Sequence, residues 1–399
     1  MNAIHPASEA SPDLADLLQK VRHIGKTIAL PAATSVDREA RFPQEAIDAL
    51  RQERLLSLYI PPAYGGEGYS FTDLVAIAQV LGQYCAATAM IWAMHQIQVA
   101  CLVHHGQSSP FFQNYLHEIA ERQLLLASIT SEVGVGGDIR NSIAAVEHDG
   151  AICRLTKKAT TVSYGAYADG YLVTARRSPE AAAGDQVFVL LRRQDTLMEQ
   201  TSNWNTFGMR GTCSPGFNVS ATLSPEQILD TPFAEIAPQT MVPFSHLLWS
   251  ACWQGIATDA MARARKFMQG KARQLRTTSL PGDNHLVQAS SDLQLMRSTN
   301  EAVVLEYTAF LSNPQYLAES ASNLGFVIRL NNVKVLASQL VVQVVQQALY
   351  ICGMAGYSEE SPFSVARHLR DAYSAALMIS NDRLMTTNAA LLLVHKEEA

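Results

Sequence analysis

The chain lacks the features that mark membrane proteins, secreted proteins and nucleic-acid-binding proteins. Its net charge is −6 over 399 residues, and it has no long run of lysine and arginine, which argues against a nucleic acid as the main partner. No apolar run approaches the roughly 20 residues that cross a bilayer, so we expect no membrane segment. The first 18 residues have neither the basic start nor the apolar core of a signal peptide.

Disulfide and metal-binding patterns are missing as well. The six cysteines are scattered, and no two of them form a C-x-x-C pair. Such spacing is typical of buried free thiols and not of a disulfide framework or a zinc site. We therefore expect a cytoplasmic protein without a metal centre.

What the sequence does contain is a change of hydrophobic period along the chain. Residues 12–125 repeat apolar side chains at helical spacing, and the stretch 71–105 predicts one helix or two joined near 86–87. Short β-like runs separated by polar turns follow to about 235, and four long helical stretches occupy the rest. We expect an α+β multidomain protein with an N-terminal helical domain (1–125), a small β-barrel or β-sandwich domain (126–235) and a C-terminal four-helix bundle (236–399).

Two segments have the composition of a site for a flat, polar ring. LLASITSEVGVGGDIRNS (124–141) leads from an apolar strand into a turn rich in Ser, Glu and Gly, and KKATTVSYGAYAD (157–169) ends a second strand in hydroxyls beside a glycine. Small residues let a backbone approach a ligand, and hydroxyls meet its edge heteroatoms. This pairing suits a flavin, although by itself it is equally compatible with two ordinary hairpins.

Five motifs, in order, resemble the acyl-CoA dehydrogenase family over nearly the whole chain. They are PPAYGGEGYS (61–70), TSEVGVGGD (130–138), TTVSYGAYAD (160–169), WNTFGMRGTCS (204–214) and ICGMAGYSEESPFSVARHLRDA (351–372). The resemblance implies the acyl-CoA dehydrogenase-like fold. It also implies an FAD-binding homotetramer or homodimer that oxidises acyl thioesters at the α,β carbons.

The resemblance further implies which residues contact the flavin ring. Ser131 takes the place of a Thr that touches the ring. Ser163 takes the place of a Thr whose hydroxyl lies near flavin N5, with backbone support from Val162. A hydroxyl can donate and accept at such positions.

The far end of the dinucleotide has its own expected contacts. Arg276 is the expected counterpart of the arginine that holds the FAD pyrophosphate, with Arg273 as a rival. Gly353 and Gly356 match glycines that let a neighbouring subunit's helix end approach the dinucleotide. An arginine fork suits phosphate, and glycine permits close backbone approach.

The usual catalytic base of the family is missing. Its members remove the α-proton with a Glu shortly after Arg-Asp-Ala or, in a minority, at the start of the first bundle helix. These two places hold Ile379 and Ser245, and neither side chain is a carboxylate that could take the proton. Gly137 also replaces a Ser on the thioester side, and Thr161 replaces a Trp that lies against the flavin.

Three residues are candidates for a substitute base. His95 lies on the long apolar helix that faces the substrate cavity in the family, His246 is next to Ser245, and Asp382 lies a turn beyond Ile379. Histidine titrates near neutrality and needs little tuning to act as a base. A helical His or Asp is, however, more often a hydrogen-bonded structural group.

Three functions follow from these patterns. The first is FAD-dependent α,β-desaturation of an acyl thioester on CoA or a carrier protein, with an electron-acceptor flavoprotein as partner. The second is a flavin-dependent monooxygenase that uses O₂ and reduced flavin from a partner reductase, since its chemistry needs no Glu. The third is a non-catalytic protein of the same fold, which explains the missing base but gives no reason for the intact cofactor motifs.

Overall fold

The N-terminal third of the chain is helical. The structure is a computed structural model that describes residues 13–276, 279–320 and 322–396. A short π-helical stretch joins the first two helices into one rod, and a capping box formed by Ser70 and Asp73 starts the fourth. Three residues separate the fourth helix from the fifth, so the stretch 71–105 forms two helices. The helices are α1 (Leu14–Ile24), α2 (Leu30–Arg38), α3 (Gln44–Gln52), α4 (Phe71–Gly82), α5 (Ala86–His105) and α6 (Pro110–Arg122).

Two sheets follow the helices. The first has the order β1-β4-β5, with β1 parallel to β4, and the second has the order β2-β3-β7-β6, with antiparallel pairs. Side chains alternate between buried and exposed along β3, whereas β4 and β5 are buried almost throughout, because the first sheet is covered on both faces. The strands are β1 (Leu126–Ile129), β2 (Val146–Asp149), β3 (Ile152–Ala159), β4 (Gly170–Arg176), β5 (Gln186–Arg192), β6 (Thr196–Gln200) and β7 (Phe217–Leu223).

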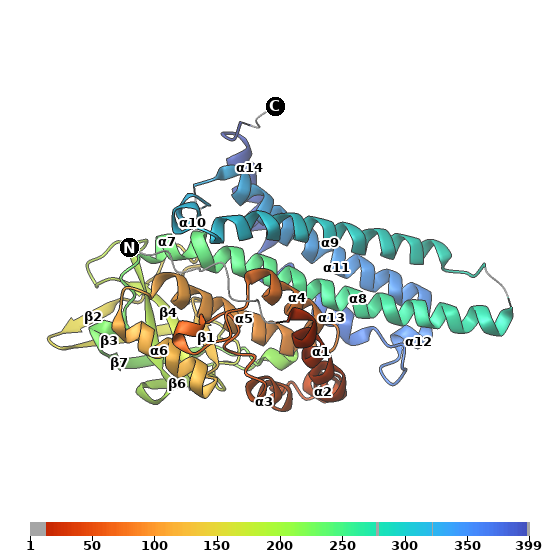
Figure 1. Ribbon diagram of the computed structural model, residues 1–399, viewed down its shortest axis with the longest axis horizontal. Coiled ribbons are helices and arrows are strands. Elements are labelled where there is room, and N and C mark those ends of the chain that lie inside the picture. Colours follow the sequence, from red (N-terminus) through yellow and green to blue (C-terminus); the bar gives the residue numbers. More distant parts are fainter. Residues whose placement is uncertain (1–12, 277–278, 321, 397–399) are drawn as a thin grey trace.

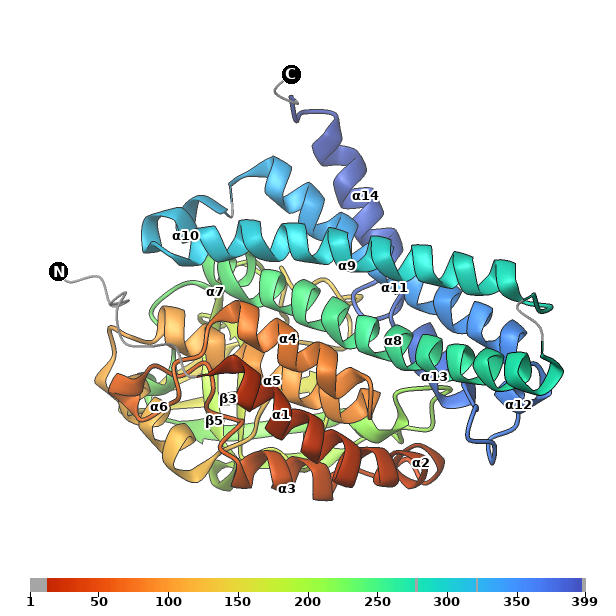
Figure 2. The same ribbon diagram turned by 45° about the vertical axis from the view of Figure 1, so that its right-hand side comes forward.

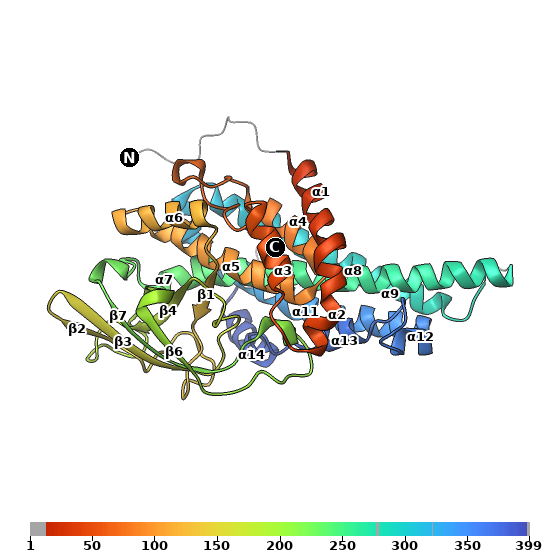
Figure 3. The same cartoon turned by 90° about the horizontal axis from the view of Figure 1, so that it is seen from below.

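Three long helices dominate the C-terminal part and extend away from the sheets (Figures 1 and 3). They are α8, α9 and α11, and shorter helices lie between and after them. The helices of this part are α7 (Phe233–Ile236), α8 (Val242–Leu275), α9 (Asp283–Leu311), α10 (Pro314–Ser320), α11 (Leu324–Cys352), α12 (Met354–Tyr357), α13 (Ala366–Tyr373) and α14 (Asn381–Leu392).

The fourth long helix of the expected bundle is broken into two. Helix α13 packs against α8 and α11, whereas α14 packs against α11, where Asn331 donates to Asn388 at 2.8 Å, and its far end points away from the long helices (Figure 2). The break spans residues 374–380, where Ile379 adopts the left-handed conformation with φ 55°. A β-branched residue in that conformation ends a helix, which the hydrophobic period alone does not reveal.

Two helices are longer and more apolar than the sequence reading allowed. By length and composition alone, α5 and α11 could each span a membrane, which corrects the expectation that no segment approaches that length. Within its most apolar window α5 is 94% buried inside the protein, and α11 is 50% buried. Helix α5 is therefore apolar because it lies in the protein core. Half of the most apolar window of α11 is not buried in the single chain.

Candidate active site

A cavity of about 590 Å³ lies where the sheets meet α5, α8 and the break after α13. Its size is typical of a ligand pocket. We call it the central cavity. Its lining comes from segments 90–98, 128–139, 161–164, 204–214, 241–249 and 370–379.

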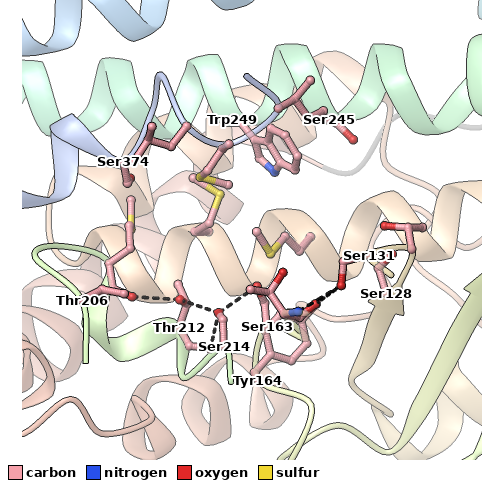
Figure 4. A pocket seen from close by; sticks show the side chains of 18 of the residues that line it. Ser128, Ser131, Ser163, Tyr164, Thr206, Thr212, Ser214, Ser245, Trp249 and Ser374 are labelled. Carbon is pink, nitrogen blue, oxygen red and sulfur yellow. Dashed lines mark hydrogen bonds between the residues drawn. The ribbon is translucent and has the colours of Figure 1, made fainter. Parts of the chain in front are cut away.

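Hydroxyl groups line one side of the central cavity (Figure 4). The Ser131 hydroxyl donates to the Thr161 carbonyl at 2.7 Å and accepts from its N–H at 3.1 Å, which ties together the two segments singled out in the sequence. The Ser214 hydroxyl donates to Ser163 Oγ at 2.9 Å and lies 2.9 Å from Thr212 Oγ1. Each of these oxygens keeps acceptor capacity for a ligand.

These hydroxyls fit the polar edge of a flavin. Ser131 and Ser163 lie in one cavity although they are distant in sequence, as expected, and apolar side chains of α5 line the same cavity. Val162 is placed differently: it is fully buried, does not line the cavity, and its N–H donates to the Pro215 carbonyl at 2.9 Å. The expected backbone support from Val162 is therefore not provided by its N–H.

The segment that carries Ser131 is fixed by a buried ion pair. The Glu132 carboxylate accepts from Ser142 Oγ at 2.7 Å and from the Ala144 N–H at 2.6 Å, and it lies 3.3 Å from Lys157 Nζ. Lys157 also donates to the Thr174 carbonyl at 2.7 Å. Burial lowers the pKa of Lys157 to about 8, and Lys157 together with the hydrogen bonds keeps the pKa of Glu132 below its usual value. The turn at 133–141 is thus held firmly at its base.

The lining that the described residues form contains no carboxylate and no imidazole. Ile379 and Ser245 both line the central cavity, so the two family positions for a base do face it. The Ser245 hydroxyl is engaged, because it donates to the Met241 carbonyl at 2.5 Å. The charged residue of the lining is Arg370, which pairs with Asp37 and Glu359.

The structure does not support His95 as the substitute base. Its Nε2 lies 2.7 Å from the Leu56 carbonyl oxygen, and its Nδ1 accepts from the Leu126 N–H at 3.0 Å. Burial lowers its pKa to about 4. With both ring nitrogens bound to backbone, His95 joins α5 to the start of β1, which is a structural role.

His246 and Asp382 also lie outside the lining of the central cavity. His246 is buried, and neither of its ring nitrogens has a partner among the described residues. Burial lowers its pKa to about 3, with a further contribution from Lys334. Asp382 is exposed in the first turn of α14. Neither placement supports a role in proton transfer.

A buried lysine holds the backbone at the position of the missing base. Lys334 Nζ donates to the Ile379 carbonyl at 2.5 Å and to Asn381 Oδ1 at 2.8 Å, and the Asn381 amide donates to Ser338 Oγ at 2.9 Å. Burial lowers the pKa of Lys334 to about 8. These contacts from α11 stabilise the left-handed conformation of Ile379 and thereby shape one wall of the cavity.

The expected pyrophosphate residues gather at the opposite end of the long helices. Arg276 follows the last residue of α8 and is exposed, and Gly353 follows α11 with φ 55°. A Cβ added to Gly282, the residue before α9, would lie 3.7 Å from Ile351 Cγ1 of α11 and 3.9 Å from Met268 Cε of α8, so this end of α8 and the end of α11 are neighbours. Gly356 is buried in α12.

Models of two domains of one family match most of the chain. The N-terminal domain of acyl-CoA dehydrogenases matches residues 11–123, and their C-terminal domain matches residues 247–379. The chain belongs to the acyl-CoA dehydrogenase family. It is a flavin-dependent oxidoreductase, as members of that family are.

Individual acyl-CoA dehydrogenases and a monooxygenase are similar to the chain. A cyclohex-1-ene-1-carbonyl-CoA dehydrogenase of Geobacter metallireducens is 26% identical over 94% of this chain and 97% of its own length. The FMN-bound structure of a dibenzothiophene monooxygenase from Paenibacillus sp. has a TM-score of 0.82 at 20% identity, and covers 96% of this chain and 98% of its own. Butyryl-CoA dehydrogenase from Megasphaera elsdenii has a TM-score of 0.80 at 18% identity, covering 97% and 100%. The two structures establish the fold.

Several polar residues of the lining were missed in the sequence, among them Gln98 and Trp249. Gln98 lies one turn after Met94 on α5, and Trp249 one turn after Ser245 on α8. A glutamine within an almost wholly buried apolar helix is a signal that sequence reasoning can use. Which cavity it faces depends on the packing of α5 against α8.

Proposed function

We propose that this acyl-CoA dehydrogenase family member uses FAD to desaturate an acyl thioester, held on CoA or on a carrier protein, at the α,β carbons. The observation that carries the proposal is the lining of the central cavity, which combines the hydroxyls of Ser131 and Ser163 with apolar side chains of α5. The hydroxyls suit the polar edge of a flavin, and the apolar side chains suit an acyl group. The bound flavin would supply the hydride acceptor.

The residues around the cavity assign the remaining roles. Ser131 and Ser163 would bind the ring edge, and Glu132 with Lys157 would hold the turn that carries Ser131. Met94 and Ile97 would pack against the acyl group and exclude water. The lining that the described residues form has no carboxylate or imidazole to take the α-proton, so substrates whose α-hydrogens are already acidic would react fastest.

The same absence favours a second function. A flavin-dependent monooxygenase that uses O₂ and reduced flavin from a reductase does not need to remove an α-proton, and a dibenzothiophene monooxygenase shares this fold. A lining with hydroxyls, thioethers and aromatic rings but no carboxylate is compatible with such a reaction. The two functions differ in substrate and in the need for oxygen.

The experiment that separates them is an anaerobic titration. The purified protein is reconstituted with FAD, and acyl-CoA thioesters such as butyryl-CoA are added without oxygen while the visible flavin band is recorded. Bleaching of the band supports desaturation. An unchanged band with every thioester, together with oxygen-dependent product formation once reduced flavin is supplied, refutes desaturation and supports the monooxygenase.

We also propose that the working enzyme is a homodimer or homotetramer. Arg276 lies 27 positions after Trp249, and a helix rise of 1.5 Å per residue puts them about 40 Å apart. That distance is longer than a dinucleotide, so Arg276 and Gly353 would hold the FAD of a neighbouring copy. Exposed apolar side chains on α9, among them Val287 and Leu305, offer a surface for it.

Two assignments follow from the chemistry. Desaturation would need an electron-acceptor flavoprotein, and monooxygenation a flavin reductase. We place the enzyme in the cytoplasm, which suits its six free cysteines.

A further inference from the structure

Two polar atoms in the wall of the central cavity have no hydrogen-bond partner. They are Gln98 Oε1 and Trp249 Nε1, each buried and without a partner in the part of the chain that the structure describes. Gln98 is 2% exposed, and both residues line the cavity. Buried polar atoms of this kind nearly always have partners in folded proteins, so an occupant of the cavity is expected to provide them.

Other polar side chains of the lining, among them Trp204, Ser214 and Ser245, are hydrogen-bonded within the protein. The indole N–H of Trp204, which also lines the cavity, donates to the Met209 carbonyl at 3.1 Å. The Ser245 hydroxyl donates to the Met241 carbonyl, and Ser214 donates to Ser163. The two unpartnered atoms are therefore not explained by a generally loose lining.

The two residues come from facing helices. His105, at the end of α5, bonds to Thr240 at 2.8 Å, just before α8 begins, and Gly82, four positions before α5 begins, packs against the Cys252 backbone in the middle of α8. The helices thus run in opposite directions. Gln98 lies about two turns before His105, and Trp249 lies between two and three turns after Thr240, which brings them to corresponding levels.

Trp249 points from α8 into the space opposite the row of hydroxyls (Figure 4). The flavin-side groups, Ser131 and Ser163, come from the β region, whereas Gln98 and Trp249 come from α5 and α8. The pair therefore belongs to the side of the cavity that is left for substrate. Met94 and Ile97 surround Gln98 with apolar surface on the same helix.

We propose that Gln98 and Trp249 form a polar subsite that binds a hydroxyl substituent of the substrate, so that the preferred substrate is a hydroxylated compound and not a plain hydrocarbon chain. The indole N–H needs an acceptor and the glutamine oxygen needs a donor. A hydroxyl is the smallest group that provides both. The proposal rests on the proposed function, because it takes the cavity to be the substrate site of a flavin enzyme. It applies both to desaturation and to monooxygenation.

The test is a binding series on the FAD-reconstituted enzyme with phenol, anisole and toluene, three rings of similar size. Phenol can donate and accept, anisole can only accept, and toluene can do neither. Binding is followed as a perturbation of the visible flavin spectrum and requires no turnover. The subsite predicts affinities in the order phenol, anisole, toluene, with phenol at least about tenfold tighter than toluene.

Substitution of each residue tests whether Gln98 and Trp249 cause the preference for phenol. Gln98→Leu is expected to weaken phenol to the level of anisole, and Trp249→Phe to weaken anisole to the level of toluene. Leu102→Met, at a buried position of α5 outside the lining, is the matched control and should keep the wild-type order. FAD content and circular dichroism identify any variant that fails to fold.

Equal affinity of the wild-type enzyme for the three rings overturns the proposal. So does the absence of a saturable change in the flavin spectrum when phenol is added up to the concentration at which toluene reaches its solubility limit. Retention of the full preference in both variants also overturns it, since water alone would then satisfy the two atoms. Failure of the thioester titration leaves this result unaffected, because the series contains no thioester.

Discussion

Replacing His246 by Phe should make this enzyme more stable, most of all in mild acid. The His246 ring is 1% exposed, and neither nitrogen makes a hydrogen bond of good geometry among the described residues, although the Val242 carbonyl one turn earlier offsets a small part of the effect of burial on its pKa. A buried polar group left without a hydrogen bond costs about 1–3 kcal/mol. Phe fills a similar volume with no polar atom, so His246→Phe should raise the free energy of unfolding by that amount at pH 7.

The pH dependence of the free energy of unfolding gives a second, independent magnitude for the effect of His246→Phe. Burial lowers the pKa of His246 to about 3 in the folded state, from 6.5 in the unfolded chain. Below pH 6.5 the unfolded state therefore binds a proton that the folded state does not, and stability falls as pH falls. The slope is about 1.4 kcal/mol per pH unit, so the advantage of the variant should grow by about 2 kcal/mol between pH 7 and pH 5.

Urea unfolding followed by circular dichroism at the two pH values measures both effects. His246→Leu guards against strain from the larger ring, and His23→Gln, at an exposed position of α1, is the control for a change in histidine number alone. A variant that is less stable, or whose advantage is the same at pH 5 and pH 7, refutes the reasoning. Turnover that vanishes in a stable, FAD-loaded variant would show instead that His246 takes part in the reaction.

Three further predictions test the supports of the cavity and the cofactor. Glu132→Gln leaves Lys157 buried without its anion and should lower the free energy of unfolding by about 3–5 kcal/mol. The double variant with Lys157→Met should recover most of that loss in a urea titration. A double variant whose loss equals the sum of the two single losses would contradict the pairing. Lys334 has a pKa of about 8 in the folded state against 10.5 unfolded, so the stability of wild type relative to Lys334→Met should rise as pH increases from about 8 to 10.5. A flat difference would show that Lys334 keeps an ordinary pKa. Arg276→Ala should lower the ratio of FAD to protein after gel filtration, because a phosphate contact is lost, and an unchanged ratio would remove the pyrophosphate assignment.

Local sequence patterns were sufficient for the order of the domains. Hydrophobic periods of helical and strand type place the helical, β and helical regions in the order that the structure shows. The motifs that contain Ser131 and Ser163 predicted one shared site, and the structure brings both into the central cavity. These features depend on neighbours in the chain, and a single sequence contains that information.

Tertiary structure decided what the cavity contains. His95 has the residue type of a base, but contacts with Leu56 and Leu126, both distant in sequence, use its two ring nitrogens. Gln98 stands out as a polar residue in an apolar helix, but only the packing of α5 against α8 decides that it faces the central cavity.

The sequence by itself determined the family, the elements and the absence of a carboxylate at residues 245 and 379. It did not determine that the last long helix breaks, because the apolar spacing continues through residues 374–380. The break depends on Lys334, 45 positions earlier, which binds the Ile379 carbonyl and stabilises its left-handed conformation. A long-range hydrogen bond of this kind exists only after α11 has packed, and it is this contact that shapes the wall where the usual base would stand.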